Sequence, residues 1–220
     1  MRRMVLPPLL FLLAGCGRKA PAPPPPAVAP AAAARTVAFL GDSLTAGLGL
    51  PEGQAYPALI QARLRQEGLP WAVVNAGVSG DTSAGGLARL DWLYRRRVDV
   101  LVVALGANDG LRGLPLTETE ANLRAILRRG RKEGSRLVLV GMQMPENLGP
   151  DYRKGFEALY PRVAREEGAV LLPFLLEGVA LDPKLNQADG IHPNAEGARV
   201  VAGTVWKTLD PLVREPAPGK

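Results

Sequence analysis

The sequence predicts an α/β fold, a three-layer α/β/α sandwich around a five-stranded, mostly parallel sheet. Five short apolar runs rich in β-branched residues are continuous rather than alternating, which is typical of strands buried on both faces. Segments with a helical period separate these runs. Strands that alternate with helices favour crossovers that place helices on both faces of a parallel sheet.

The five expected strands are the apolar runs themselves. They lie at 36–40, 72–75, 98–105, 136–140 and 169–172. Each run is short and is followed by polar or glycine-containing sequence, which favours a buried strand over a helix.

Five helices are expected between and after the strands, because apolar side chains recur there three or four residues apart and would form one stripe. The stripes lie at 58–64, 87–94, 123–127, 158–163 and 198–205. Thr117 and Glu120 have the spacing of a capping box, which predicts that Thr117 caps the third of these helices.

The first 15 residues are expected to be a signal peptide and to take no part in the fold. Arg2 and Arg3 precede the apolar run 5–13, which is too short to span a bilayer. The run ends at Leu13-Ala14-Gly15-Cys16, which resembles a bacterial lipobox. We therefore expect an exported protein that is lipid-anchored to the cell envelope through Cys16. An ordinary secretory signal with an incidental cysteine is the alternative.

Residues 16–35 are rich in Pro and Ala, and we expect them to form a semi-rigid spacer next to the anchor. A ligand for a proline-binding domain is the alternative. Residues 36–220 remain, which is enough for one domain with a substantial core.

The composition excludes several kinds of site and partner. Cys16 is the only cysteine and His192 the only histidine, so we expect no intramolecular disulfide, no metal centre and no cofactor. The 27 Lys and Arg residues exceed the 21 Asp and Glu residues, but they are scattered along the chain. No nucleic-acid-binding motif occurs and only 5% of residues are aromatic, so we expect no nucleic-acid partner. We expect a monomer.

Four short polar blocks occur in fixed order, and three of them follow within a few residues of the end of a predicted strand. The blocks are Gly41-Asp42-Ser43-Leu44, Gly80-Asp81-Thr82, Gly106-Ala107-Asn108-Asp109 and Asp189-Gly190-Ile191-His192-Pro193. The carboxyl ends of parallel strands meet at one edge of the sheet, where ligands bind. We therefore expect the blocks to form one site.

These blocks contain the groups that acyl transfer to water requires. Ser43 is the candidate nucleophile, although a serine there could instead cap a helix. His192 is the candidate general base, and Asp189 lies three residues earlier, within reach of its Nδ1. Asp189 could otherwise be a simple turn residue before Gly190.

Three hydrogen-bond donors could stabilise the oxyanion of such a reaction: the Gly80 N–H, the Asn108 side-chain amide and the Ser43 N–H. Gly80 and Asn108 could each be turn residues instead. We expect Asp42 and Asp81 to be structural and to bond backbone groups within their own turns.

The four blocks resemble those of the SGNH, or GDSL, hydrolases over about residues 36–213. The likeness is greatest to the bacterial thioesterase I/arylesterase/lysophospholipase branch, through 79–83, 86–90 and 108–113. This resemblance implies a flavodoxin-like sheet, a Ser43–His192–Asp189 triad and an oxyanion hole made by Ser43, Gly80 and Asn108. The lipobox and the long spacer depart from the soluble periplasmic members.

The function expected is hydrolysis of carboxylic esters or thioesters through an acyl-enzyme on Ser43. Six apolar residues in loops could bind the acyl chain: Leu48, Leu50, Leu111, Leu114, Met144 and Leu148. One alternative is an O-deacetylase of envelope carbohydrate, which the same site could perform. A lipid-anchored binding protein without turnover is another.

Overall fold

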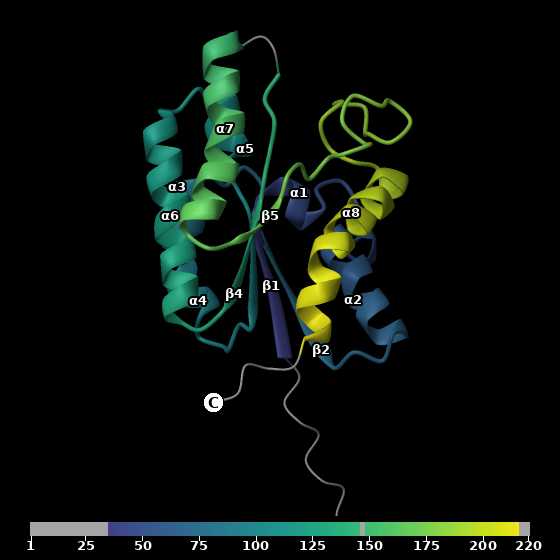
Figure 1. Ribbon diagram of the computed structural model, residues 1–220. Coiled ribbons are helices and arrows are strands. Elements are labelled where there is room, and N and C mark those ends of the chain that lie inside the picture. The colour runs from purple at the N-terminus through teal and green to yellow at the C-terminus, as the bar shows by residue number, and fades with distance from the viewer. Residues whose placement is uncertain (1–34, 146–147, 216–220) are drawn as a thin grey trace, which may run out of the picture. The chain divides into compact units, whose positions relative to one another are not determined.

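A parallel five-stranded sheet forms the middle layer of the computed structural model, which describes residues 35–145 and 148–215 (Figure 1). The strand order is β2-β1-β3-β4-β5, and all four pairings are parallel. The strands are β1 (Arg35–Gly41), β2 (Trp71–Gly77), β3 (Val100–Ala104), β4 (Arg136–Val140) and β5 (Val170–Leu172). All five predicted strands are confirmed. The predicted signal peptide, Cys16 and the spacer up to residue 34 lie outside the described residues.

Helices cover both faces of the sheet, as predicted (Figure 1). One layer contains α2 (Tyr56–Gln66) and α8 (Ala195–Arg214), which contact each other, with the short α1 (Ser43–Ala46) and a 3-10 turn at Glu52–Gln54. The other layer contains α3 (Ser83–Ala88), α4 (Leu90–Leu93), α5 (Ala107–Leu111), α6 (Leu116–Lys132) and α7 (Pro150–Glu166). Every residue of β3 is buried, because this central strand has helices on both sides.

The predicted helix at 87–94 is divided into α3 and α4 at Arg89. The Arg89 guanidinium turns inward, where it pairs with Asp81 at 2.7 Å and donates to the carbonyl of Ala76 at 3.0 Å. A single apolar stripe could not reveal this contact, because Ala76 lies at the end of another strand.

The predicted capping box is wrong. Helix α6 begins at Leu116 after Pro115, and Thr117 lies inside its first turn. The Glu120 carboxylate does not turn back to a backbone N–H, because it pairs with Arg124 of its own helix and Arg162 of α7.

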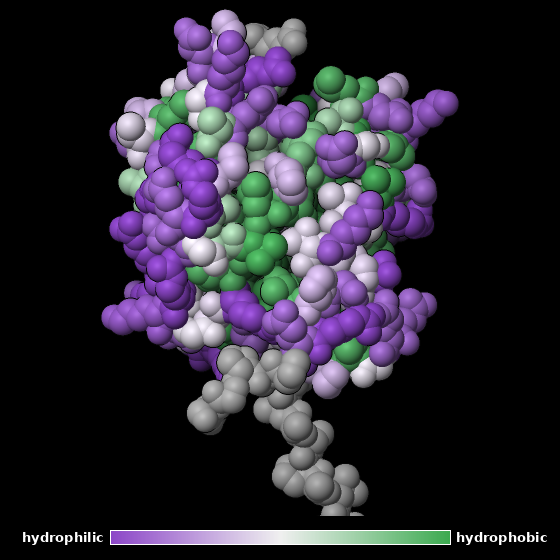
Figure 2. Space-filling model, in the orientation of Figure 1, coloured by the Kyte–Doolittle hydropathy of each residue, from purple (hydrophilic) through white to green (hydrophobic). Residues whose placement is uncertain are grey.

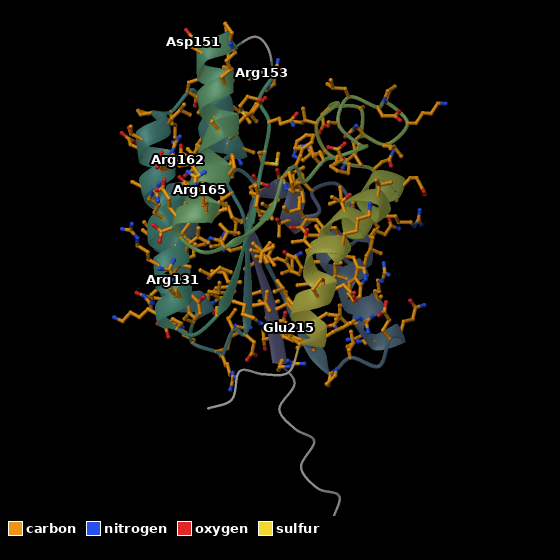
Figure 3. All side chains as sticks on the ribbon, in the orientation of Figure 1. Arg131, Asp151, Arg153, Arg162, Arg165 and Glu215 are labelled. Carbon is orange, nitrogen blue, oxygen red and sulfur yellow. The ribbon has the colours of Figure 1, made fainter. Side chains whose placement is uncertain are left out.

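Ion pairs join the outer surfaces of α6 and α7, where charged side chains including Arg131, Arg162 and Arg165 project (Figure 3). Glu167 is the centre of the group: its side chain is only 4% exposed and pairs with Arg124, Arg128 and Arg131.

None of the helices in residues 35–145 and 148–215 is both long and apolar enough to span a bilayer.

Candidate active site

Ser43 begins α1 directly after the carboxyl end of β1. The turn is tight: a Cβ at Gly41 would lie 2.0 Å from the Thr45 Oγ1, so only glycine fits. Asp42 is the N-cap of α1, and its carboxylate accepts the Leu44 N–H at 3.0 Å. The prediction of a local backbone bond for Asp42 is therefore confirmed, whereas Asp81 pairs with the Arg89 side chain instead. The alternative of Ser43 as the helix cap is wrong, because Asp42 has that role.

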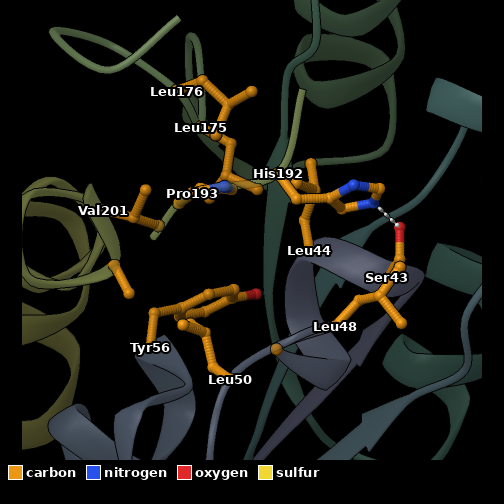
Figure 4. A pocket seen from close by; sticks show the side chains of 12 residues that line it. Ser43, Leu44, Leu48, Leu50, Tyr56, Leu175, Leu176, His192, Pro193 and Val201 are labelled. Atoms are coloured by element: carbon orange, nitrogen blue, oxygen red, sulfur yellow. Dashed lines mark hydrogen bonds between the residues drawn. The ribbon is translucent and has the colours of Figure 1, made fainter. Parts of the chain in front are cut away.

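The three predicted triad residues lie in one hydrogen-bonded row. The Ser43 Oγ is 2.8 Å from the His192 Nε2, as the dashed line in Figure 4 marks. The His192 Nδ1 is 2.7 Å from the Asp189 Oδ2. With the Nδ1 proton donated to the carboxylate, the Nε2 is free to accept the Ser43 proton. This arrangement can activate a serine for attack on a carbonyl.

Asp189 is held in its ionised form by the loop it belongs to. Its Oδ1 accepts the N–H groups of Ile191 and His192, each at 3.0 Å. These bonds, with the bond from the His192 ring, lower the pKa of Asp189 to about 2. The carboxylate therefore stays negative at any pH near neutrality and can stabilise a protonated His192.

Gln187 connects the histidine loop to the serine segment, a role that no sequence motif indicates. Its Nε2 donates to the carbonyls of Leu48 and Pro193 at 2.7 and 3.0 Å. Its backbone N–H donates to the His192 carbonyl at 2.8 Å. Asn194 then caps α8 directly after the loop. The loop is thus fixed on both sides of His192.

The predicted oxyanion donors lie around the same cavity as Ser43. Gly80 has a left-handed backbone with φ of 78°, and within the described residues its N–H has no protein acceptor. The Asn108 Nδ2 donates to the Asp81 carbonyl at 2.9 Å and lies 3.5 Å from the Asp42 Oδ2, which orients the amide. The Ser43 N–H is at the first position of a helix, where no intrahelical acceptor exists.

A buried carboxylate, Asp109, joins two of the polar blocks beneath the site. It accepts the Ser83 N–H at 2.8 Å, the Ser83 hydroxyl, and the Thr119 hydroxyl at 3.3 Å. The Asn122 amide donates to the Ser83 Oγ at 3.0 Å. Asp109 thereby fixes the start of α3, which follows Gly80, against the helix that holds Asn108. The sequence placed Asp109 in a block but did not predict this role.

Asp42 is a second buried carboxyl of the site, next to the nucleophile, with 2% of its surface exposed. Burial raises its pKa to about 6, which outweighs the opposing effect of the Leu44 hydrogen bond. The positive charge that His192 can carry also favours the ionised carboxylate.

A cavity of about 400 Å³ opens beside Ser43 and His192. Three of the predicted acyl-binding residues line it: Leu48, Leu111 and Met144. Sequence reasoning missed Phe174, Leu176, Ala180 and Leu181, which also line the cavity together with Leu44, Ala107, Met142, Pro145 and Ile191. The four missed residues come from the segment between β5 and α8, in a part that no motif marks.

The other three predicted acyl-binding residues lie elsewhere. Leu148 packs against the hydrophobic core. Leu50 lines a separate cavity of about 10 Å³ behind His192, near Tyr56 (Figure 4). Leu114 lies under α7, where its carbonyl accepts the Tyr152 hydroxyl at 2.8 Å.

Within the described residues, no group of three or more His, Cys, Asp or Glu side chains could hold a metal ion.

Comparisons with known proteins agree with this geometry. The profile of the GDSL-like Lipase/Acylhydrolase family matches residues 39–200. Esterase TesA of Pseudomonas aeruginosa is 46% identical over 183 residues, which are 83% of this chain and 91% of that protein. Thioesterase 1/protease 1/lysophospholipase L1 of Escherichia coli K12 is 43% identical over 183 residues, 83% of this chain and 86% of that protein.

Solved structures show the same fold. The crystal structure of TesA matches with a TM-score of 0.78 and 45% identity, over 81% of this chain and 99% of that one. Psychrotrophic esterase EstA from Pseudoalteromonas sp. matches with a TM-score of 0.79 and 30% identity, over 82% of this chain and 100% of that one.

Proposed function

We propose that Ser43 is the nucleophile of this chain, which belongs to the GDSL-like lipase/acylhydrolase family and is a serine hydrolase of carboxylic esters and thioesters. His192 is the general base, and Asp189 is the carboxylate that orients this base. The observation that carries the proposal is the row of hydrogen bonds from Ser43 through His192 to Asp189 at the mouth of an apolar cavity.

Acylation begins when the Ser43 Oγ bonds to the carbonyl carbon of the substrate and its proton moves to the His192 Nε2. The carbonyl electron pair moves to oxygen, and the resulting oxyanion accepts hydrogen bonds from Ser43, Gly80 and Asn108. When the pair returns, the bond to the alcohol or thiol breaks, and the leaving group takes the proton from the Nε2. An ester of Ser43 remains.

Deacylation repeats these steps with water. His192 accepts a proton from the water as its oxygen bonds to the acyl carbon, and the carboxylic acid leaves as the proton returns to the Ser43 Oγ. The negative charge of Asp189 stabilises protonated His192 in both halves of the reaction.

The cavity supports a preference for acyl chains longer than acetyl. Most of its apolar lining consists of Leu, Met, Phe and Ile side chains, which offer an acetyl group no specific partner. Each methylene that the cavity removes from water contributes about 0.8 kcal/mol, or about fourfold in kcat/KM. We expect this gain to continue until the chain fills the cavity.

A series of p-nitrophenyl esters from acetyl to palmitoyl tests the proposal. We expect kcat/KM to rise over the first members and Ser43→Ala to abolish turnover. The matched control is Ser135→Ala, because Ser135 lies beside β4 and bonds the Val98 carbonyl, remote from the cavity. Turnover by Ser43→Ala equal to that of the wild type would contradict the role of Ser43. A preference for acetylated sugars over long acyl esters would identify a deacetylase instead.

We also propose that Cys16 carries a lipid anchor and that the enzyme is exported to the cell envelope. The support is the sequence Leu13-Ala14-Gly15-Cys16 after a short apolar run. Growth with labelled palmitate should label the wild type and leave Cys16→Ser unlabelled. Label in neither protein would favour an ordinary secretory signal.

We propose that the enzyme works as a monomer without a nucleic-acid partner, since a single chain supplies every group of the site. Light scattering after size-exclusion chromatography tests the first point, and a mass of twice the chain's would contradict it.

A further inference from the structure

Four exposed apolar side chains surround the mouth of the large cavity. Leu48, Leu111, Leu181 and Ile191 all line it, and their exposed fractions are 46%, 48%, 91% and 50%. We call these four residues the apolar rim. Only three other large apolar side chains among the described residues are exposed: Val78, Trp92 and Val170.

The rim is assembled from three separate segments. Leu48 follows α1 and Leu111 ends α5, whereas Leu181 and Ile191 both lie in the long loop between β5 and α8, with Ile191 next to His192. Figure 2 shows hydrophobic surface over the loop between β5 and α8. Single exposed apolar residues are normal on a soluble protein, but a group that converges on one mouth indicates an interaction site.

Leu181 adds an observation from the backbone. It is the only residue other than glycine with positive φ in the described part of the chain, at 66°. This left-handed conformation is disfavoured for a residue with a Cβ, and the side chain gains no burial in return. Strained backbone of this kind clusters at active sites and ligand clamps. The fold therefore holds an apolar side chain in water at a local cost.

The occupant of the rim must cover apolar surface outside the cavity as well as deliver an acyl chain into it. A soluble ester would fill the cavity and leave Leu181 in water. The surface of a lipid layer would cover the rim, and the apolar path would continue inward along Met144 and Phe174. Arg112 and Lys184 are exposed cations in the segments that carry the rim, where lipid phosphates would meet them.

We propose that the apolar rim docks the enzyme on a phospholipid bilayer, so that an acyl chain passes from the bilayer into the cavity without crossing water. This inference rests on the proposed role of the cavity in acyl binding. It goes further because it assigns a surface outside the reacting groups to a partner, the lipid layer.

The test measures binding to phosphatidylcholine vesicles by co-sedimentation. The protein is the full chain with Ser43→Ala, which prevents cleavage of the lipid, and Cys16→Ser, which prevents acylation of the protein. Leu181→Ser and the double variant Leu181→Ser/Ile191→Ser are compared in this background. The matched control is Val170→Ser, because Val170 is also apolar and 43% exposed, but it does not line the cavity and pairs with Val138 in the middle of β4. Thermal melts check that every variant is folded.

We expect Leu181→Ser to weaken vesicle binding by roughly tenfold or more and the double variant further, since burying one such side chain accounts for factors of about 10 to 100. Val170→Ser should bind within about twofold of its parent. Leu181→Trp should show a blue-shifted emission with vesicles and Val170→Trp should not.

Equal binding by all variants, or no binding by the parent, would overturn the proposal. Self-association that Leu181→Ser abolishes, without vesicle binding, would show that a second copy covers the rim. Hydrolysis of a soluble butyryl ester by the chain with Ser43 intact is measured alongside. This separates failure of docking from failure of the proposed function.

Discussion

Replacement of Asp42 by asparagine should change the pH dependence of stability. The free energy of unfolding of the variant, minus that of the wild type, should be higher at neutral pH than at pH 4. The Asp42 carboxyl is 2% exposed, and burial raises its pKa from 3.8 to about 6. Between pH 3.8 and about pH 6, the Asp42 carboxyl is protonated in the folded state and ionised in the unfolded state. The free energy of unfolding therefore falls as the pH rises through this window, and the loss is complete above pH 6.

The magnitude follows from the shift. One pKa unit corresponds to 1.36 kcal/mol, so a shift of about two units destabilises the wild type by about 3 kcal/mol at pH 7 relative to pH 4. Asn cannot ionise, and its carbonyl oxygen can still accept the Leu44 N–H that Asp42 accepts at 3.0 Å. The difference between variant and wild type should therefore grow by about 3 kcal/mol between pH 4 and pH 7.

Urea unfolding of both proteins at intervals from pH 4 to pH 8 measures this difference. Asp91→Asn is a suitable control, because it removes the same charge from a side chain that is 87% exposed. A difference between Asp42→Asn and wild type that stays constant across this range would refute the reasoning, since it would mean that the buried carboxyl keeps an ordinary pKa.

Three further substitutions have defined outcomes. Asn108→Ala should lower kcat by roughly 100- to 1000-fold through loss of one oxyanion donor, and a steady-state assay that gives an unchanged kcat would exclude that role. Asp189→Asn should lower kcat by about 10⁴-fold, because it disturbs the orientation of His192 but leaves the nucleophile in place. The loss in Ser43→Ala should be larger, roughly 10⁶-fold, and equal losses in the two variants would contradict this order. Glu167→Ala should lower the free energy of unfolding in urea by about 1 to 2 kcal/mol with kcat intact, because it removes three ion pairs that contribute up to about 1 kcal/mol each, and an unchanged free energy would show that solvent replaces these pairs.

The strands and the polar blocks could be predicted because both depend on residues that are close together in the sequence. The run 100–104 is apolar throughout since helices cover both faces of the central strand, and that pattern needs no knowledge of distant residues. Ser43 and Asn108 follow strand ends, and the parallel order of the strands then brings them to one edge. Asp189 lies three residues before His192, so their hydrogen bond is a local property of one loop.

The features that the sequence did not reveal depend on contacts between distant segments. Arg89 divides a predicted helix because it pairs with Asp81 and the end of β2. Glu120 leaves the predicted capping box because Arg162 of another helix reaches it. Gln187 and the lining residue Phe174 belong to no motif, and their roles arise only when the loop after β5 folds over the serine.

The central claim is that His192 activates Ser43 at this site. Labelling of the full chain with a fluorophosphonate, followed by mass spectrometry of the digested protein, tests it most directly. We predict one phosphonylated peptide with the modification on Ser43, and a labelling rate that falls at least 1000-fold in His192→Ala. Modification at any other residue, or equal labelling rates in the wild type and His192→Ala, would contradict the account.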